Sequence, residues 1–444
     1  MTDSDLASRI AEVAADPVAV PAQTQAMVIN RVIDNAAVSA ASVGDHLVSG
    51  VRAQARAHRN TPGATIFGIE GTFSPEWAAF ANGVAVHHLE LNDAVGADQP
   101  THPGGVIPAL VAVGQHTGLR GVDLIRGIAT AYEIQVRLTT VDNTVDHGAL
   151  LGTSVAAGLG TMLRLPPPTI RAAIGHAVHL TGVRHTPAYA GKLAVDAVDR
   201  AMRGGDAPPP TALEQLDGVV LPHIGEPKQA ILASYPRQHS AHCHGQAAID
   251  LALRLHHRVG RVSDIESVVL HTGHHTHVQL GSGADDPDKF DPDAPREVLS
   301  RSLMYLFAVA LQDGQWHHDR SYTCERAHRP ETVALWHSTS TVETAGVQAC
   351  AVRAVITLRS GEVIADELAV AHAHPAGAHP FTRNDYVAKF ALLTAGVIDR
   401  REQQRFLDVA VCLSELRRGA LGMLNPLVDR RILDDAPTTY GIYR

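Results

Sequence analysis

The sequence predicts a mainly α protein in which a helical domain, built from both chain ends, carries an inserted α+β domain. Apolar residues recur at helical spacing over most of residues 3–203 and again from residue 384 onward. Between these regions, apolar and polar positions alternate at residues 265–271 and 351–370, which indicates strands. A chain of 444 residues, 45% of them hydrophobic, is long enough to build two cores.

The N-terminal region is predicted as a series of helices. Ser4 is a candidate cap for the first helix, and Ser74-Pro75-Glu76 supplies a hydroxyl, a proline and an acid where a helix start favours them. Further helices are expected at residues 23–42, 105–115, 122–139, 153–163, 168–180 and 191–202. Residues 204–219 contain Gly-Gly and Pro-Pro-Pro and predict a linker or surface excursion near a domain boundary.

The central region predicts the inserted α+β layer. We expect helices at residues 246–255, 296–311 and 330–336, a strand at 265–271, and a hairpin around Ser360-Gly361. Helical patterns return at residues 384–395, 401–412 and 414–421. The predicted domains are therefore residues 1–233 and 383–444 for the helical domain and 234–382 for the inserted α+β domain.

Composition excludes several classes of protein. A net charge of -9 argues against a nucleic-acid or acidic-membrane partner. The first residues lack a signal peptide's basic and apolar regions, and the longest apolar runs are too short to span a bilayer. The four cysteines are far apart and show no CxxC, as expected in a reducing cytoplasm. We therefore expect a cytoplasmic protein with no membrane segment.

An acid and an imidazole stand out near residue 100. Asp93 follows a predicted helix, and His102 lies on the loop before the next one. Reactive groups are often placed on loops of a rigid frame, so the two side chains could converge on one cleft. The alternative stays open that Asp93 caps a helix terminus and that His102 is a surface residue.

A second group follows Tyr235. Arg237, His239, His242 and His244 could hold carboxylates through charge-assisted hydrogen bonds, or could form an ordinary polar helix start. On a helix the side chains of His242 and His244 would diverge, and no zinc-site spacing accompanies them.

Other concentrations of polar residues favour structural roles. The acids at residues 285–293 do not follow calcium-loop spacing. We therefore expect these acids and the histidines at residues 271–277 to lie on a solvated loop after a strand. For Trp316-His317-His318, packing and turn polarity are favoured. No strand-linked GxGxxG, GxxxxGKS or GxSxG occurs, and the cysteines lack the spacing of an iron-sulfur site. Neither a metal nor a cofactor is expected.

Five stretches resemble the MmgE/PrpD family, closest to its 2-methylcitrate dehydratase branch. They are residues 82–93 with His102-Pro103-Gly104, 151–158, 189–195, 281–289 and 302–314. The resemblance implies a helical domain with an inserted α+β lid, a homodimer, and cofactor-independent chemistry on a small polycarboxylate. Its activities include dehydration of 2-methylcitrate, in the methylcitrate cycle of propionate catabolism, and decarboxylation of cis-aconitate.

The resemblance also implies roles for named residues. Asp93 and His102 are the expected catalytic pair, with either of them as the base. The expected substrate-binding residues are Arg184, Lys192, Arg237, His239, His244 and Tyr305.

Two departures from the family pattern keep alternatives open. Leu150 and Leu151 stand where members commonly have a histidine, and residues 181–187 are shortened where relatives carry Trp-Lys. The altered residues favour two rivals: a decarboxylase or epimerase on a related acid, and a degenerate member that only binds a metabolite or partner.

Overall fold

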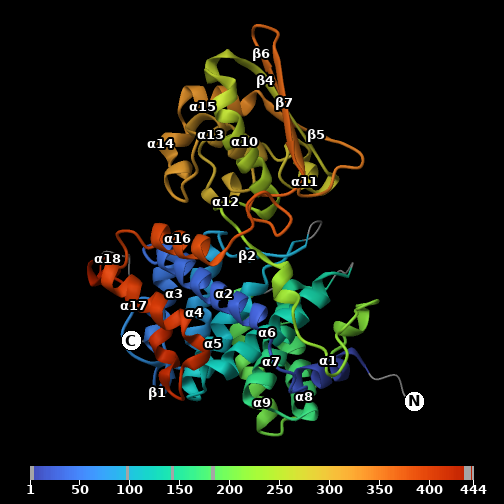
Figure 1. Cartoon of the computed structure of the whole chain (residues 1–444), viewed down its shortest axis with the longest axis vertical. Coiled ribbons are helices and arrows are strands. Elements are labelled where there is room, and N and C mark those ends of the chain that lie inside the picture. The colour runs from blue at the N-terminus through green and yellow to red at the C-terminus, as the bar shows by residue number, and fades with distance from the viewer. Residues whose placement is uncertain (1–4, 97–99, 142–144, 182–185, 435–441, 443–444) are drawn as a thin grey trace. The chain divides into compact units, whose positions relative to one another are not determined.

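The computed structural model describes residues 5–96, 100–141, 145–181, 186–434 and 442. It forms two compact units (Figure 1). Unit 1 comprises Met1–His88, Thr101–Ser234 and Thr382–Arg444, and unit 2 comprises Leu89–Pro100 and Tyr235–Phe381. The mainly α class, with an α+β unit inserted into a helical one, is confirmed. The predicted domain limits after residues 233 and 382 each lie one residue from the observed limits, which follow Ser234 and Phe381. The segment Leu89–Pro100, predicted as part of the helical domain, groups with unit 2.

Unit 1 is almost entirely helical. Among the described residues, no helix is long and apolar enough to cross a membrane. Its α-helices are α1 (Leu6–Ala15), α2 (Ala22–Ala41), α3 (His46–Arg56), α4 (Pro75–His88), α5 (Ile107–His116), α6 (Gly121–Thr139), α7 (His147–Leu163), α8 (Pro167–Thr181), α9 (Pro187–Met202), α16 (Arg383–Leu393), α17 (Arg400–Val411) and α18 (Arg430–Asp434). Shorter elements are β1 (Arg59–Ala64) and the 3-10 helices η1 (Pro103–Val106), η2 (Leu213–Gln215), η3 (Ala230–Ala233), η9 (Leu413–Glu415) and η10 (Ala420–Leu424).

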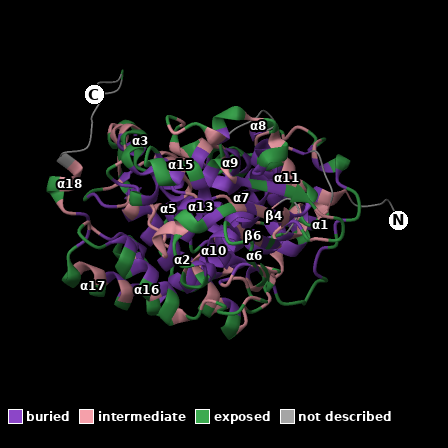
Figure 2. Cartoon of the chain, turned by 90° about the horizontal axis from the view of Figure 1, so that it is seen from above, coloured by how far each residue is buried: buried purple, intermediate pink, exposed green. Residues whose placement is uncertain are grey.

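Helix α7 is the central helix of unit 1. It packs against α6, α8 and α9, and every residue from 148 to 162 is buried (Figure 2). Small side chains allow the close approach to α6, because a Cβ on Gly158 would lie 2.8 Å from the carbonyl oxygen of Gly127. The abundance of Ala and Gly in these helices therefore serves close helix packing.

Buried polar contacts join the two chain ends within unit 1. Lys389 of α16 lies 2.7 Å from the carboxylate of Asp34 on α2, and these side chains are 7% and 1% exposed. Arg31 of α2 donates to Tyr386 of α16 at 2.8 Å and to Ser234 at 2.9 Å. These contacts explain how the C-terminal helices complete a domain that begins at the N-terminus.

Three details of unit 1 differ from the sequence prediction. Asp5 caps α1 by accepting the Ser8 N–H at 2.7 Å, whereas the predicted cap, Ser4, lies outside the described residues. The predicted helix at 414–421 is instead η9 and η10, separated at Gly419 with φ 79°. Helix α3 and strand β1 were not predicted.

Unit 2 consists of a four-stranded sheet with packed helices and a separate two-stranded ladder. The sheet order is β5-β4-β6-β7, with β4 parallel to β5 and antiparallel to β6, and β6 antiparallel to β7. Helices α10 and α13 pack on it. The strands are β2 (Asp93–Ala94), β3 (Tyr235–Pro236), β4 (Ile265–Thr272), β5 (Thr339–Glu343), β6 (Val352–Leu358) and β7 (Val363–Leu368). The helices are α10 (Gln246–Val259), α11 (His274–Gln279), α12 (Arg296–Leu299), α13 (Leu303–Asp313), α14 (Cys324–Ala327), α15 (Pro330–His337), η4 (Cys243–Gly245), η5 (Val262–Asp264), η6 (Ser282–Ala284), η7 (Pro287–Phe290) and η8 (Arg320–Tyr322).

The predicted hairpin and the strand at 265–271 are confirmed as β6–β7 and β4. The predicted helix at 296–311 is two helices, because Ser302 caps α13 by accepting the Tyr305 N–H at 3.3 Å. Strand β5 was not predicted. A parallel partner in a sheet can be distant in sequence, so nothing local to β5 identifies it.

Candidate functional site

Asp93 lies in unit 2, in a short strand that pairs with the start of the long insertion. In the β2–β3 ladder, Asp93 stands opposite Pro236 and Ala94 opposite Tyr235. Asp93 is 1% exposed. Asp93 belongs to this ladder, five residues after α4 ends at His88.

Arg237 holds the residue before Asp93. Its Nε donates to the carbonyl oxygen of Asn92 at 3.0 Å, and its Nη2 donates to the side-chain oxygen of Asn92. Its Nη1 reaches the carbonyl oxygen of Ala241 at 3.5 Å. Arg237 and Asn92 are 1% and 0% exposed. The guanidinium therefore positions the Asn92–Asp93 segment, a different role from the direct substrate contact that the resemblance implies.

Two more arginines hold the turn that leads to Asp93. Arg296 donates to the carbonyl oxygen of Leu89 at 3.5 Å, and Arg301 lies 3.4 Å from the carboxylate of Glu90. Glu90 has φ 51°, a left-handed conformation that is uncommon for a residue with a side chain. Backbone conformations of this kind persist where surrounding contacts fix them, as the arginines do here.

His239 forms a buried pair with an acid on α10. Its Nε2 lies 2.8 Å from Oδ1 of Asp250, and the backbone N–H of His372 donates to Oδ2 at 2.7 Å. Burial would raise the pKa of the Asp250 carboxyl, but the His239 imidazole and these hydrogen bonds outweigh it and lower the pKa. The acid orients His239, as the acid of a catalytic dyad does. Asp250 was not predicted, although an acid within the apolar run of residues 247–253 was a usable signal.

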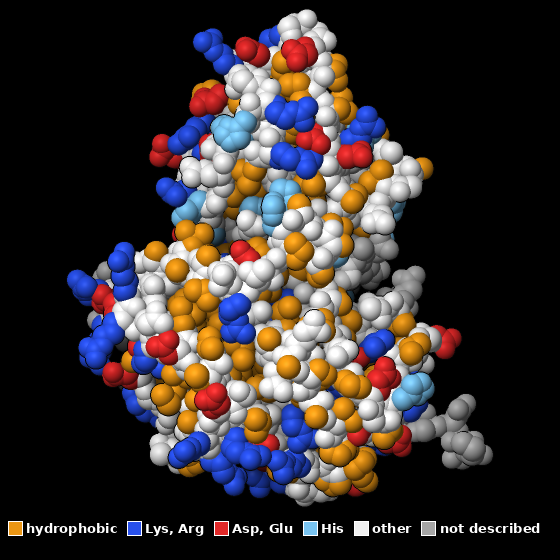
Figure 3. Space-filling model, viewed as in Figure 1, with side chains coloured by type: hydrophobic (Ala, Val, Ile, Leu, Met, Phe, Trp, Pro, Cys, Tyr) orange, Lys and Arg blue, Asp and Glu red, His pale blue; other side chains and the backbone are white. Residues whose placement is uncertain are grey.

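His242 and His244 meet, contrary to expectation. Their ring centroids are 5.2 Å apart, because the residues precede α10 and do not lie on it. Burial, with the charges of His244, Arg237 and Arg301, lowers the pKa of His242 to about 2. His242 is therefore a neutral imidazole at pH 7, and its Nδ1 accepts the His244 N–H at 3.4 Å. Histidines gather on the visible face of unit 2 in Figure 3.

Tyr305 lies in the core of unit 2. It is 0% exposed, its hydroxyl donates to the carbonyl oxygen of Ser321 at 2.6 Å, and its ring contacts Trp336 with centroids 4.9 Å apart. Burial raises the pKa of the phenol. This environment favours a packing role for Tyr305 over the implied substrate contact.

His102 lies in unit 1, directly before η1. Its ring centroid is 6.3 Å from that of His87, the penultimate residue of α4, and the two rings meet edge to face. A Cβ on Gly105 would lie 2.7 Å from Nε2 of His87, so a glycine at 105 leaves room for that imidazole. His87 was not predicted as a site residue, although it lies within the stretch 82–93 that resembles the family.

Lys192, on α9, lies over aromatic rings of unit 1. Its Nζ is 4.5 Å from the centroid of Trp77 and 5.7 Å from that of Tyr189, and 3.9 Å from the Asp196 carboxylate. Such cation–π contacts hold an ammonium group in place without neutralising it. Arg184 lies outside the described residues.

Leu150 and Leu151, at the position of the family's common histidine, are 0% and 2% exposed on α7. Both are core residues, so this turn of α7 offers no polar side chain at the two positions.

The remaining polar clusters have local roles. The stretch expected as a solvated loop after β4 contains helix α11, which spans His274–Gln279. His317 accepts N–H groups of Asp319 and Arg320 through Nδ1, and Trp316 donates to Ser240 at 3.1 Å. Within the described residues, two groups bring three potential metal ligands together, and each includes an exposed acid. They are His317, His318 and Asp319, and Asp293, Cys324 and His328.

The fold and these side chains define a class of two-domain protein: a helical unit with an α+β insertion that holds a buried carboxylate, arginines and histidines. The chain matches the MmgE/PrpD N-terminal domain over residues 4–231 and the MmgE/PrpD C-terminal domain over residues 239–415. It therefore belongs to the MmgE/PrpD family. That family includes 2-methylcitrate dehydratases and related enzymes.

Proposed function

We propose that the protein is a cofactor-independent hydro-lyase that dehydrates 2-methylcitrate or a related small polycarboxylate, as in the methylcitrate cycle of propionate catabolism. The observation that carries the proposal is the arginine-held Asp93 segment in a member of this family. A base that removes a weakly acidic proton must be held in fixed geometry, and a segment bound by Arg237, Arg296 and Arg301 meets that need.

Dehydration requires a base, an acid and groups that bind carboxylates. The base takes the proton from the carbon beside a carboxylate, and the C–H electrons form the double bond. The hydroxyl of the neighbouring carbon leaves with its bonding electrons and a proton from the acid, as water. We assign these two roles to Asp93 and His102, in either order.

The carboxylates need cationic or hydrogen-bonding partners. Lys192 is our first candidate in unit 1, because its ammonium group is held over the rings of Trp77 and Tyr189. His239 and His244 are the candidates in unit 2, and Arg184 remains a candidate from the sequence alone. Arg237 acts through Asn92, so we assign it the role of positioning Asp93.

A related reaction is the second candidate function. Leu150 and Leu151 are apolar core residues where the family commonly has a histidine. A changed set of acids and bases on the same scaffold favours decarboxylation or epimerisation of a related acid. The third candidate function is that of a family member that only binds a metabolite or partner and has no activity.

The deciding assay is ultraviolet absorbance of the conjugated product after mixing the protein with synthetic 2-methylcitrate. We expect the signal to grow with wild-type protein and to be lost in Asp93→Asn and in His102→Ala. Folded wild-type protein that gives no signal at high concentration would overturn the dehydratase. Product analysis on di- and tricarboxylates would then detect a decarboxylase or epimerase. A protein that only binds its ligand would show a shift in melting temperature with carboxylates but no turnover.

We also propose that the protein is a cytoplasmic homodimer, as the resemblance implies. Light scattering after size exclusion should give about twice the chain mass of 47.2 kDa. A mass of one chain at micromolar concentration would contradict the dimer.

A further inference from the structure

A groove of about 770 Å³ lies in unit 1, and none of the residues assigned above to the reaction lines it. Its lining consists of Arg56 and Arg59, the turn from Gly68 to Gly71, which we call the floor, and residues of the segment from Leu427 to Leu433. We call it the arginine groove. Sites for small molecules commonly enclose about 300–1,000 Å³, so this groove is of ligand size.

The floor of the arginine groove is fixed by backbone contacts. The Gly68 N–H donates to the carbonyl oxygen of Pro426 at 3.1 Å, and the Val428 N–H donates to that of Gly68 at 3.0 Å. Asn425 donates to the carbonyl oxygen of Ile69 at 2.9 Å. Gly68 has φ 86°, and a Cβ there would lie 2.8 Å from Val428. The groove is therefore formed before any ligand arrives, which lowers the cost of binding.

The charge of the groove is positive, in a chain whose net charge is -9. Arg56, Arg59 and Arg430 line it, with Glu70 as the single acid among its lining residues. Across the described part of the chain, no carboxylate lies within ion-pair distance of Arg56 or Arg59. Figure 3 shows Lys and Arg side chains gathered on this side of unit 1, where Figure 1 places α18.

The side chains around Arg56 and Arg59 do not offset their positive charge. Arg59 lies 5.8 Å from the ring centroid of Phe73. Arg52, one helical turn before Arg56 on α3, is 5% exposed and donates to the carbonyl oxygen of Val43 at 2.8 Å. Burial and the charge of Arg56 lower the pKa of Arg52 to about 10. Like charges four residues apart on a helix repel each other, so an anion at Arg56 would relieve this repulsion.

The ion pair between Arg430 and Glu70 is open to exchange. Arg430 lies 3.1 Å from the Glu70 carboxylate, and these side chains are 81% and 68% exposed. Ion pairs this exposed contribute little, so an incoming anion can replace Glu70 at Arg430. The guanidinium groups match carboxylate and phosphate oxygens in paired hydrogen bonds. Ile69 of the floor and Val428 of the C-terminal segment add buried apolar side chains to the lining.

We propose that the arginine groove binds an organic polyanion, a small molecule with two or more phosphate or carboxylate groups on a carbon body. The charges fit the anionic groups, and the apolar floor fits the carbon body. This site is independent of the proposed dehydratase function, because it uses none of the residues assigned to that reaction.

Calorimetric titration of the full chain at low ionic strength tests the proposal, with inorganic pyrophosphate and citrate as the anionic probes and triethyl citrate as the neutral one. The groove variant is Arg56→Gln/Arg59→Gln. The matched control is Arg417→Gln/Arg418→Gln, which removes the same charge from exposed residues of unit 1 outside the groove. Both pairs are exposed, so both variants should fold.

We expect pyrophosphate to bind the wild type and the control alike and to bind the groove variant about tenfold or more weakly. Triethyl citrate should not bind the groove. Citrate can also bind at the proposed substrate site, so the readout is a citrate site that the groove variant lacks and the control keeps. If that site is seen, carboxylates suffice as ligand groups; if it is not, the ligand groups are phosphates. Equal pyrophosphate binding by the groove variant and the wild type, or none by the wild type at millimolar concentration, would overturn the proposal.

Discussion

Replacing Arg237 with methionine should destabilise unit 2 strongly. Arg237 donates to both oxygens of Asn92, and both residues are at most 1% exposed, so water cannot replace the lost donors. A buried acceptor without a partner costs about 1–3 kcal/mol. The backbone N–H of residue 237 still donates to the carbonyl oxygen of Asn92 at 3.4 Å, so the loss falls mainly on the Asn92 side-chain oxygen and should be about 2 kcal/mol. At a urea dependence of about 3 kcal/mol per M, the unfolding midpoint should fall by roughly 0.7 M.

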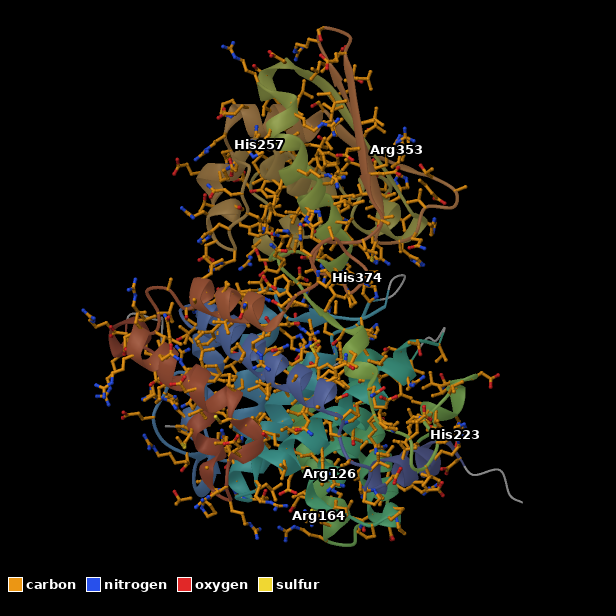
Figure 4. The ribbon with its side chains drawn as sticks, in the orientation of Figure 1. Arg126, Arg164, His223, His257, Arg353 and His374 are labelled. Atoms are coloured by element: carbon orange, nitrogen blue, oxygen red, sulfur yellow. The ribbon has the colours of Figure 1, made fainter. Side chains whose placement is uncertain are left out.

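Urea unfolding followed by circular dichroism measures this effect, and Arg353→Met is the matched control. Arg353 is exposed on β6 of the same unit (Figure 4), and its replacement should change stability by less than about 0.5 kcal/mol. Because the chain has two units, the transition of unit 2 must be identified before a midpoint is compared. Equal midpoints for Arg237→Met and Arg353→Met would refute the positioning role of Arg237.

Three further predictions concern pH, a buried ion pair and a glycine. The folded state holds His242 with a pKa of about 2, below its unfolded value of 6.5, so stability should be full above pH 6.5. Below that pH, stability should fall by up to about 1.4 kcal/mol per pH unit. In His242→Gln the urea midpoint should therefore change less between pH 6.5 and 5 than it does in the wild type. An equal change in both proteins would contradict this. Lys389→Met leaves Asp34 buried without its cation and should cost about 3–5 kcal/mol, measured by the same unfolding, whereas a loss below about 1 kcal/mol would exclude the pair as a structural contact. A Cβ on Gly121 would lie 1.6 Å from a backbone oxygen of the C-terminal segment, so Gly121→Ala should lose about 3 kcal/mol. Gly50→Ala, with no atom within 4 Å of the added Cβ, should gain up to about 1 kcal/mol, and equal melting temperatures for the two would contradict the packing.

Helices and the hairpin were predictable because their signals are local. The apolar spacing of α2, α6 and α10 and the turn at Ser360-Gly361 each lie within one stretch of chain. Elements fixed by distant partners were not predictable. Strand β5 exists through its parallel pairing with β4, and the short β2 exists through β3, about 140 residues later.

The candidate site was predicted as residues but not as contacts. Asp93, His102 and His239 were chosen from residue type and family resemblance, which carry no information on partners. The acid that orients His239 is Asp250, on α10, and Asn92 receives the Arg237 hydrogen bonds across the β2–β3 ladder. Only the folded chain shows that Arg237 supports Asp93's segment and that Tyr305 is a core residue.

The role of Arg237 in positioning Asp93 is tested most directly by a double-mutant cycle on the rate of 2-methylcitrate dehydration, with Asp93→Asn, Arg237→Lys and the double variant. A lysine keeps the charge but cannot bond both oxygens of Asn92, so Arg237→Lys should slow the reaction by mispositioning Asp93. We predict that Asp93→Asn lowers the rate by about a hundredfold or more, and that adding Arg237→Lys to it changes the rate less than about twofold. Full activity in Asp93→Asn, or two losses that simply multiply, would contradict the claim that Arg237 acts through Asp93.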